Sequence, residues 1–348
     1  MTVCMSPWYQ KDNSWYNNFF GFSSEMSLDR ITRLQQRQVS IVCVVPVHNE
    51  AENIVAFLSE LSDKLATLAE QYEIILVDDG SQDETVMLAQ SMMATTKLRI
   101  LQFSRNFGKE AALTAGLMQV RSEICILIDA DFQHPLATID AFLAQWAQGY
   151  DMVYGVRESR QDEALLKRWL SQIFYRLLKA ITNVKIPPHA GDFRLLDQCV
   201  VKALNALPER ERFMKGLYAW VGFKNIAVPF AVQARQAGKS SWHFNHLLEL
   251  AIVGITSFSN IPLRVFSLLG FIISLVAFIY GSVILFDTLI TGIEVPGFAT
   301  LAVAIMFFGG IQLLSIGVLG EYVARIFNEV KQRPIYIIAN KIGFNNGE

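Results

Sequence analysis

The sequence has few cysteines, and no apolar run opens it. Its four cysteines lie at positions 4, 43, 125 and 199 without metal-ligand spacing, and two of them fall in apolar runs typical of strands. We therefore expect neither a zinc site nor a disulfide framework, and a reducing, cytosolic setting fits better. The lack of an opening apolar run argues against a cleavable signal peptide.

Charged residues are also scarce, at 18% of 348 residues, whereas 52% are apolar and the mean hydropathy is +0.30. This composition excludes a disordered chain, and the length suits one large or two ordinary domains. The net charge is only −2, but residues 157–239 hold 15 basic and 7 acidic side chains, a local charge of +8. We expect an anionic partner to meet this segment.

Residues 1–38 mix aromatic side chains with polar ones and show no regular pattern. We expect them to form a poorly ordered extension. The alternative is that their aromatic side chains contact a membrane surface or a neighbouring subunit.

Five short apolar runs follow residue 38, and helix-length stretches separate them. The runs cover residues 39–45, 72–77, 98–103, 123–128 and 151–156. This alternation predicts a parallel α/β sheet, and the continuous apolar character of the runs indicates that both faces of the sheet are covered. In such sheets ligands bind beyond the carboxyl ends of the strands, so the residues just after each run are candidates for function.

Two stretches near the C-terminus, 265–286 and 297–319, contain no charged residue. As helices each is about 33 Å long, which is enough to cross a bilayer. We predict a transmembrane hairpin over 264–322, because nothing nearby is amphipathic enough to cover these helices in a soluble core. The turn between them lacks Lys and Arg, whereas basic residues flank the hairpin on both sides. The positive-inside rule therefore places both flanks, with the catalytic part, both termini and the tail 323–348, in the cytoplasm.

Two further helices are expected between the sheet and the hairpin. Residues 161–181 repeat apolar positions every three or four residues with basic residues between them, which suits a membrane surface or, alternatively, a docking helix. Residues 241–263 are apolar but short for a span, so we predict an interfacial helix, with a third crossing as the alternative.

A pair of carboxylates follows the fourth apolar run. Asp129 and Asp131 flank Ala130, and Gln133 lies two residues further on. Carboxylates two residues apart at a strand end can converge on one Mg²⁺ or Mn²⁺ ion whose other ligands are phosphate oxygens. The alternative is an Asx-type turn that caps the next helix.

Polar clusters also follow the first three runs. After the third run, Arg105 and Lys109 could neutralise a diphosphate. The acids after the first two runs could accept hydrogen bonds from a base or a ribose, and crowded carboxylates repel one another unless a cation or donor is present. The residues of the first two clusters are Pro46, Asn49, Glu50, Asp78 and Asp79.

Together these motifs resemble the inverting glycosyltransferases of family 2, which have the GT-A fold, an α/β fold of the Rossmann-like kind. Four further stretches are similar to the polyprenyl-phosphate glycosyltransferases, and most of all to the bactoprenol glucosyltransferase group. They are residues 104–110, 191–196, 213–216 and 317–322. The resemblance covers residues 39 to about 338, with the soluble motifs and the hairpin in the same order, and implies a GT-A domain over 39–240.

The resemblance also implies roles for single residues. Asp131 and Asp192 are implied as catalytic residues, and Asp129, Asp131 and Gln133 as metal ligands. Asp192 matches the family acid near the acceptor phosphate, where it acts as a base or orients Arg194 or the acceptor. The implied nucleotide-sugar residues are Pro46, Asn49, Glu50, Asp78, Asp79, Lys109, Asp129 and Ala130.

Basic residues in the positive segment are implied to bind a lipid phosphate, with an ordinary solvated basic surface as the alternative for each. They are Arg157, Lys167, Arg168, Arg194 and Lys215. His134 is a departure, because glucosyl members usually carry Asp there, and it leaves the identity of the sugar open. We consider His134 a neighbour of the metal site rather than a ligand.

The reaction implied is transfer of a hexose, glucose from UDP-glucose, to undecaprenyl phosphate on the cytoplasmic leaflet of the bacterial inner membrane, for O-antigen or cell-envelope glycans. GlcNAc, mannose or a modified sugar are alternatives. Mg²⁺ or Mn²⁺ is the implied cofactor. The implied partners are a bilayer, a separate flippase and further copies of the chain, for which a tetramer is one option, but no nucleic acid. The tail segment 334–338 is expected to form a strand that pairs with a neighbour's edge.

Two other functions remain open at this stage. A polysaccharide synthase of the same fold usually has more spans and a Gln-x-x-Arg-Trp motif, and the sequence has neither. A non-catalytic membrane scaffold would not need Asp129, Asp131 and Asp192, and all three are present.

Overall fold

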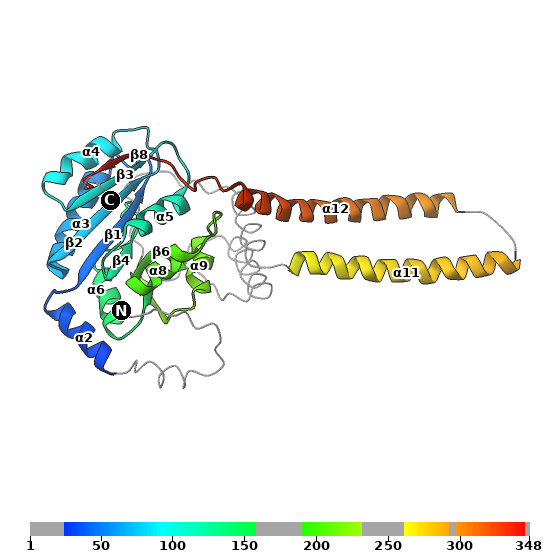
Figure 1. Ribbon diagram of the computed structural model, residues 1–348, viewed down its shortest axis with the longest axis horizontal. Coiled ribbons are helices and arrows are strands. Elements are labelled where there is room, and N and C mark those ends of the chain that lie inside the picture. The colour runs from blue at the N-terminus through cyan, green and yellow to red at the C-terminus, as the bar shows by residue number, and fades with distance from the viewer. Residues whose placement is uncertain (1–23, 158–189, 232–260, 292–296, 345–348) are drawn as a thin grey trace. The chain divides into compact units, whose positions relative to one another are not determined.

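Eight strands form one mixed sheet in the computed structural model, which describes residues 24–157, 190–231, 261–291 and 297–344 (Figure 1). The order across the sheet is β7-β5-β6-β4-β1-β2-β3-β8. The strands are β1 Ser40–Val47, β2 Gln71–Asp78, β3 Leu98–Phe103, β4 Ile124–Leu127, β5 Met152–Arg157, β6 Ala190–Asp197, β7 Asn225–Phe230 and β8 Ile338–Ile342.

The five predicted strands are confirmed to within two residues at each end, and they are β1 to β5. The expected parallel pairing holds for β1 with β2, β1 with β4 and β2 with β3. The sheet is not parallel throughout, because β6 lies antiparallel between β4 and β5. Residues 191–194, Gly-Asp-Phe-Arg, were noted as a motif, but no strand was predicted there.

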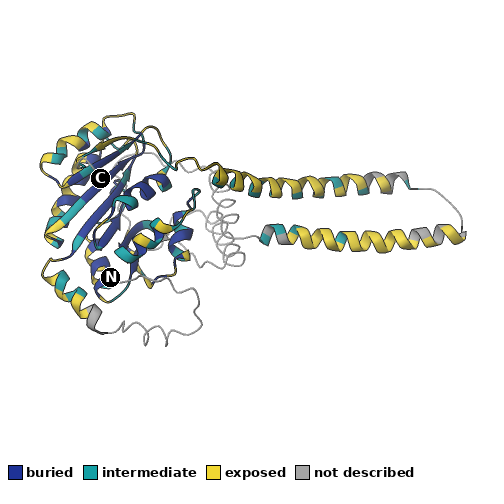
Figure 2. Cartoon of the chain, in the orientation of Figure 1, coloured by how far each residue is buried: buried dark blue, intermediate teal, exposed yellow. Residues whose placement is uncertain are grey.

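Helices cover the central strands, whose residues are almost all buried (Figure 2). Helix α5 packs tightly on β1, since a Cβ on Gly116 would lie 2.2 Å from Val44 Cγ1. Glycine is therefore required there for the helix to pack on the strand. The helices around the sheet are α3 Ile54–Leu68, α4 Thr85–Ser91, α5 Lys109–Gln119, α6 Thr138–Ala147, α8 Gln198–Ala206 and α9 Met214–Trp220, with a short 3₁₀ turn η1 at Met92–Ala94.

Helix α2, Ser24–Gln35, lies within the segment expected to be poorly ordered, so that expectation is wrong for these residues. Arg30 attaches the helix to the sheet domain. Its guanidinium pairs with Asp197 at 2.9 Å and with Asp151 at 3.6 Å, and lies 4.8 Å from the centre of the Trp146 ring. Burial, and after it the negative charge of Asp197, raises the pKa of Asp151 to about 6.

An Arg30→Ala variant is expected to lower the free energy of unfolding by roughly 2–4 kcal/mol, because it leaves buried Asp151 and largely buried Asp197 without their cation. Thermal unfolding of the purified protein measures the loss. The exposed neighbour Asp29 provides the control, and Asp29→Ala should change the melting temperature little. Equal melting temperatures for Arg30→Ala and the wild type would mean that α2 is not held by this ion pair.

Two long helices follow, α11 Ile261–Thr291 and α12 Phe298–Lys331, and they contact each other. Both are long and apolar enough to cross a bilayer, with candidate stretches Val265–Val283 and Ala304–Lys331. Their large apolar side chains are exposed, for example Phe278 at 74% and Met306 at 77%. Apolar surface on this scale is typical of contact with lipid or another protein. Both helices extend beyond the predicted spans.

Residues 334–344 belong to the same compact unit as the sheet. The predicted strand at 334–338 overlaps the observed strand β8 only at Ile338. β8 lies antiparallel to β3 of the same chain. Tyr336 reinforces this contact by stacking on Phe103 with ring centres 5.0 Å apart.

Two predicted helices, 161–181 and most of 241–263, lie outside the described residues. Cys43 and Cys125 are buried in the central strands.

Candidate active site

The carboxyl ends of β1, β2, β3 and β4 meet at one edge of the sheet, and the polar motifs lie there (Figure 1). The turn after β1 is hydrogen-bonded to the turn after β2. The backbone N–H of Asn49 donates to Ser81 Oγ at 2.9 Å, and its side-chain Oδ1 accepts from the Gln82 N–H at 2.9 Å. Asn49 has a φ of +55°, a left-handed conformation that Asn tolerates better than most residues.

Other predicted residues of the first motif also make internal contacts. The Glu50 N–H donates to Thr85 Oγ1 at 2.9 Å, and its carboxylate accepts from Asn53 Nδ2 at 3.2 Å. Pro46 lies inside β1, opposite Val77 of β2. These residues shape the edge of the sheet.

The two aspartates at the end of β2 are buried, with 0% of Asp78 and 4% of Asp79 exposed. Asp78 accepts from the Ser81 N–H at 3.2 Å, and burial raises its pKa. Asp79 accepts from the N–H groups of Phe107 and Gly108 at 2.6 and 2.9 Å. We expected both acids to contact a nucleotide, but the structure places them beneath the surface. There Asp78 holds the turn before α4, and Asp79 holds the loop before α5.

Gly80 allows the loop before α5 to pack against the turn after β2. A Cβ at Gly80 would lie 2.4 Å from the carbonyl carbon of Arg105, and the residue has a φ of +69°. Both the close approach and the left-handed backbone exclude a larger residue.

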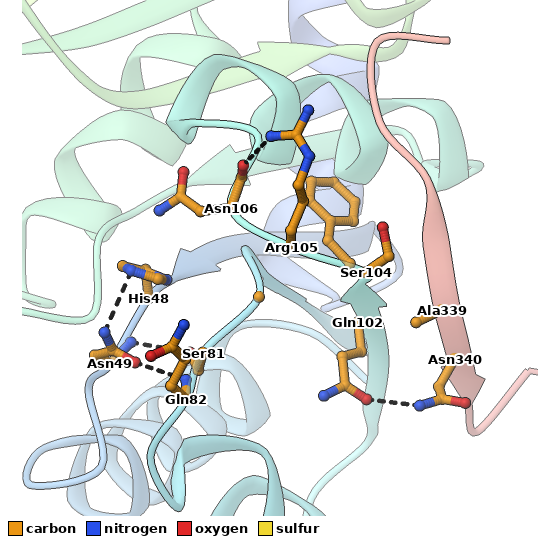
Figure 3. Close-up of a pocket in the computed structure, with 12 residues that line it drawn as sticks. His48, Asn49, Ser81, Gln82, Gln102, Ser104, Arg105, Asn106, Ala339 and Asn340 are labelled. Atoms are coloured by element: carbon orange, nitrogen blue, oxygen red, sulfur yellow. Dashed lines mark hydrogen bonds between the residues drawn. The ribbon is translucent and has the colours of Figure 1, made fainter.

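A pocket of about 490 Å³ lies on the outer side of this loop (Figure 3). Asn49 is the only predicted nucleotide-sugar residue among those that line it. The lining residues are His48, Asn49, Gly80, Ser81, Gln82, Gln102, Phe103, Ser104, Arg105, Asn106, Ala339 and Asn340.

Lys109 joins two carboxylates at the start of α5. Its Nζ lies 2.7 Å from Asp129 Oδ1 and 3.0 Å from Asp192 Oδ2. Although desolvation opposes it, these carboxylates raise the pKa of Lys109 above its usual range. Burial alone would raise the pKa of Asp192, but Lys109 and Lys215 hold it well below its usual range. Asp192 is therefore ionised at neutral pH, and within the described residues its Oδ1 has no hydrogen-bond partner.

The Asp129–Ala130–Asp131 segment turns sharply after β4. Buried Phe132 has a φ of +56° and packs edge-on against Phe57. Asp131 Oδ1 accepts from the Gln133 N–H at 3.1 Å, as in the Asx turn considered above. Gln133 Oε1 accepts from Arg157 Nη2 at 3.1 Å.

The donor set at this turn fits a divalent cation. In the described part of the chain, no three His, Cys, Asp or Glu side chains converge as a metal cluster. Magnesium in nucleotide sites needs fewer protein ligands, because one or two carboxylates, substrate phosphates and water complete its shell. Two carboxylates and an amide oxygen, from Asp129, Asp131 and Gln133, match that requirement.

His134 is buried, with 4% exposed, and packs against Phe193 and Phe230. Its Nδ1 lies 4.0 Å from Asp131 Oδ1, too far for a hydrogen bond. Burial lowers the pKa of His134, which favours a neutral ring at pH 7. These contacts give His134 a packing role behind the turn.

Three of the five predicted lipid-phosphate residues, Arg157, Arg194 and Lys215, lie within the described residues, and they differ in exposure. Arg157 and Lys215 are partly exposed, whereas Lys167 and Arg168 lie outside the described residues. Arg194 is only 2% exposed, and its guanidinium stacks on Tyr218 at 4.1 Å and donates to the Gly191 carbonyl. It therefore does not offer its charge to a ligand in this structure, contrary to our expectation.

Glu110 is a member of this cluster that sequence reasoning missed. Its Oε2 accepts from the Met214 N–H at 3.2 Å and so attaches the start of α9 to α5. Burial and Asp192 raise the pKa of Glu110 to about 8. The signal available was its place beside Lys109 in the 104–110 motif.

Glu110 should make stability depend on pH. Because the folded chain holds this proton more tightly than an unfolded Glu with a pKa near 4.5, its contribution is full below that pH and is lost as the pH rises to about 8. The melting temperature is expected to fall between pH 6.5 and 8, and Glu110→Gln should flatten the fall. Exposed Glu60 of α3 gives the control, Glu60→Gln. An unchanged slope in Glu110→Gln would contradict the assignment.

The chain is similar to known glycosyltransferases. The model of glycosyl transferase family 2 matches residues 42–204. The chain is similar to the bactoprenol glucosyl transferase of Shigella phage SfV, with 41% identity over 304 residues, 87% of this chain and 99% of the relative. It is also similar to an uncharacterized glycosyltransferase of Synechocystis, with 44% identity over 306 residues, 88% of this chain and 96% of the relative.

Among solved structures, the chain is similar to glucosyl-3-phosphoglycerate synthase from Mycobacterium tuberculosis in complex with Mn²⁺, UDP and phosphoglyceric acid. The identity is 18% and the TM-score 0.44, over 65% of this chain and 80% of that one.

Proposed function

Because the chain belongs to glycosyltransferase family 2, in its polyprenyl-phosphate group, we propose that it transfers glucose from UDP-glucose to undecaprenyl phosphate. Relatives more than 40% identical over almost their full length carry the name bactoprenol glucosyl transferase, which supports this acceptor and this sugar. The product would be a lipid-linked glucose for O-antigen or cell-envelope glycans.

The observation that carries the proposal is the arrangement around Lys109. An ammonium held between Asp129 and Asp192 brings the acidic turn after β4 together with the motif on β6. One side of this cluster offers carboxylates for a cation, and the other offers an ionised acid next to basic Lys215. A sugar diphosphate and a phosphate acceptor need two such adjacent sites.

Transfer would be one displacement at the anomeric carbon of the sugar. An oxygen of the lipid phosphate forms the new bond to that carbon, while the bond to the UDP oxygen breaks and UDP leaves with the electron pair. Attack opposite the leaving group inverts an α-linked donor to a β-linked product.

Asp129, Asp131 and Gln133 would hold the divalent cation, Mg²⁺ or Mn²⁺. Such an ion neutralises the charge that develops on a departing diphosphate. The Lys109 ammonium adds a fixed positive charge beside it, and Asp129 and Asp192 keep that charge in place.

Asp192 would act by orientation, not as a base. A carboxylate with a strongly lowered pKa is a poor proton acceptor, and a lipid phosphate is already a nucleophile at neutral pH. Of the predicted basic residues, Arg157, Lys215, Lys167 and Arg168 remain candidates for the lipid phosphate, whereas buried Arg194 would act only through its neighbours.

The two apolar helices would anchor the enzyme in the bacterial inner membrane as a hairpin, with the sheet domain and both termini in the cytoplasm. The proposal includes assembly with further copies of the chain and a separate flippase for the product, because two helices are too few for a sugar path.

Transfer of radiolabelled sugar into lipid that can be extracted with organic solvent tests the function. Detergent-purified protein, undecaprenyl phosphate and a panel of UDP- and GDP-sugars are incubated with Mg²⁺ or Mn²⁺, with and without EDTA. We expect labelling from UDP-glucose that EDTA abolishes. Labelling from another donor would correct the sugar, and no labelling by folded protein would refute the proposal.

A further inference from the structure

Lys109 and Glu110 are neighbours in the first turn of α5 but contact different elements. Lys109 pairs with Asp129 after β4 and with Asp192 on β6. Glu110 Oε2 instead accepts from the backbone N–H of Met214, the first residue of α9, at 3.2 Å. The proposed function uses Lys109 but gives Glu110 no role in transfer.

The start of α9 receives its cap from this contact. The first N–H groups of a helix have no partner within the helix, and a Ser or Asp just before it often accepts from one of them. The residue before α9 is Phe213, whose side chain has no hydrogen-bond acceptor. Glu110 supplies the acceptor from a position 104 residues earlier in the chain. It therefore attaches α9 to α5 at a defined point.

Further along, α9 is attached to β6. Tyr218 is 1% exposed, and the centre of its ring lies 4.1 Å from Arg194 Cζ. Arg194 and Asp192 are two residues apart on β6, so their side chains leave the same face of the strand. Met214, four residues before Tyr218 on the same side of α9, is also buried. Both contacts of α9 thus lead to the elements that carry Lys109 and Asp192.

Lys215 lies between these two contacts, directly after Met214 and three residues before Tyr218. Its side chain is partly exposed, whereas those two neighbours are buried. Although burial would raise the pKa of Asp192, the charges of Lys109 and then Lys215 hold it below its usual range, so Lys215 acts on that carboxylate. The place of the Lys215 ammonium therefore depends on how the start of α9 is held.

We propose that Glu110 is a positioning residue for the acceptor side of the reaction. By holding the start of α9, it keeps the Lys215 ammonium beside Asp192, where the phosphate of the lipid acceptor would bind. The first turn of α5 then serves both substrates, because Lys109 lies beside the donor diphosphate and Glu110 acts on the acceptor through Lys215. The inference rests on the proposed function, since it takes a lipid phosphate as the acceptor.

Steady-state kinetics of the full-length protein in detergent, with undecaprenyl phosphate and UDP-glucose varied in turn, test the inference. Glu110→Met keeps the length of the side chain but removes the acceptor for the Met214 N–H. We expect its KM for undecaprenyl phosphate to rise about tenfold, the effect of one lost hydrogen bond to a charged group, while kcat and the KM for UDP-glucose stay within about twofold. Glu110→Gln keeps an oxygen that can accept from the same N–H and should restore the wild-type KM.

Asn205→Ala is the matched control, because Asn205 also ties a helix to α5. Its Nδ2 donates to the Leu117 carbonyl at 2.9 Å, near the opposite end of α5 from Glu110. This variant should lose stability without a change in the KM for the lipid.

A double variant gives a second test. Lys215→Met alone should raise the KM for the lipid about tenfold or more. Adding Glu110→Met should raise it less than about twofold further, because both changes act on one ammonium and their effects are then not additive.

The outcomes separate this inference from the function. If the wild type transfers glucose and Glu110→Met leaves the KM for the lipid unchanged, the inference is overturned while the function stands. Equal rises in Glu110→Met and Asn205→Ala, or additive rises in the double variant, would also overturn it, because Glu110 would then not act through Lys215. If Glu110→Met does not fold, Glu110→Asp, one methylene shorter, takes its place in each comparison. A folded wild type that transfers no sugar would overturn both.

Discussion

An Asp131→Asn variant is expected to transfer sugar about a thousandfold more slowly than the wild type, because it loses the charge that holds the divalent cation. Asn keeps an oxygen that can accept from the Gln133 N–H, so the turn after β4 should survive and the melting temperature should stay unchanged. The measurement is the initial rate of lipid labelling at saturating UDP-glucose, together with a titration of Mn²⁺.

Asp140→Asn on α6 is the matched control, since Asp140 is exposed and pairs only at the surface with Lys64. It should retain the wild-type rate. If Asp131→Asn kept more than a tenth of that rate at low Mn²⁺, the cation would not be held at Asp131.

Removing the ammonium at Lys109 should have the second-largest effect. Lys109→Met keeps the length of the side chain but takes the ammonium away from Asp129 and leaves Lys215 as the nearer cation for Asp192, so negative charge builds up beside the site proposed for the donor diphosphate. We expect the rate of a single turnover to fall roughly 100- to 1000-fold, as for other fixed charges at a reacting centre.

Lys109→Arg retains the charge and should recover part of that rate. Exposed Lys97, which donates to the Glu70 carbonyl, provides the control substitution Lys97→Met. A normal single-turnover rate in Lys109→Met would show that the two ion pairs serve only the fold.

The central strands could be predicted from sequence because their signals are local. Each is a short apolar run followed by a polar motif, and parallel pairing brings the ends of such strands to one edge. This reasoning put Asp129 and Lys109 at one edge of the sheet, whereas Asp192 was implied only by the family resemblance and lies on a strand that the pattern did not identify. The structure joins all three through the Lys109 ion pairs.

The sequence could not show which polar side chains already have partners within the fold. Asp79 has the sequence context of a ligand residue, but its carboxylate accepts hydrogen bonds from the backbone of the loop after β3. Arg194 looks like a phosphate ligand, yet two tyrosines distant in sequence enclose it. The edge position of β8 likewise depends on a contact across more than 200 residues, which no local pattern encodes.

The return of β8 to the sheet makes the apolar helices an insertion within a discontinuous domain. A truncated protein that stops before the first apolar helix would keep most of the sheet but lose its last strand. The edge of β3 would then expose unpaired N–H and C=O groups, and Phe103 would lose its stacking partner Tyr336, which favours aggregation. A soluble version of this enzyme therefore needs residues 334–344, rejoined to the domain by a flexible linker in place of the helices.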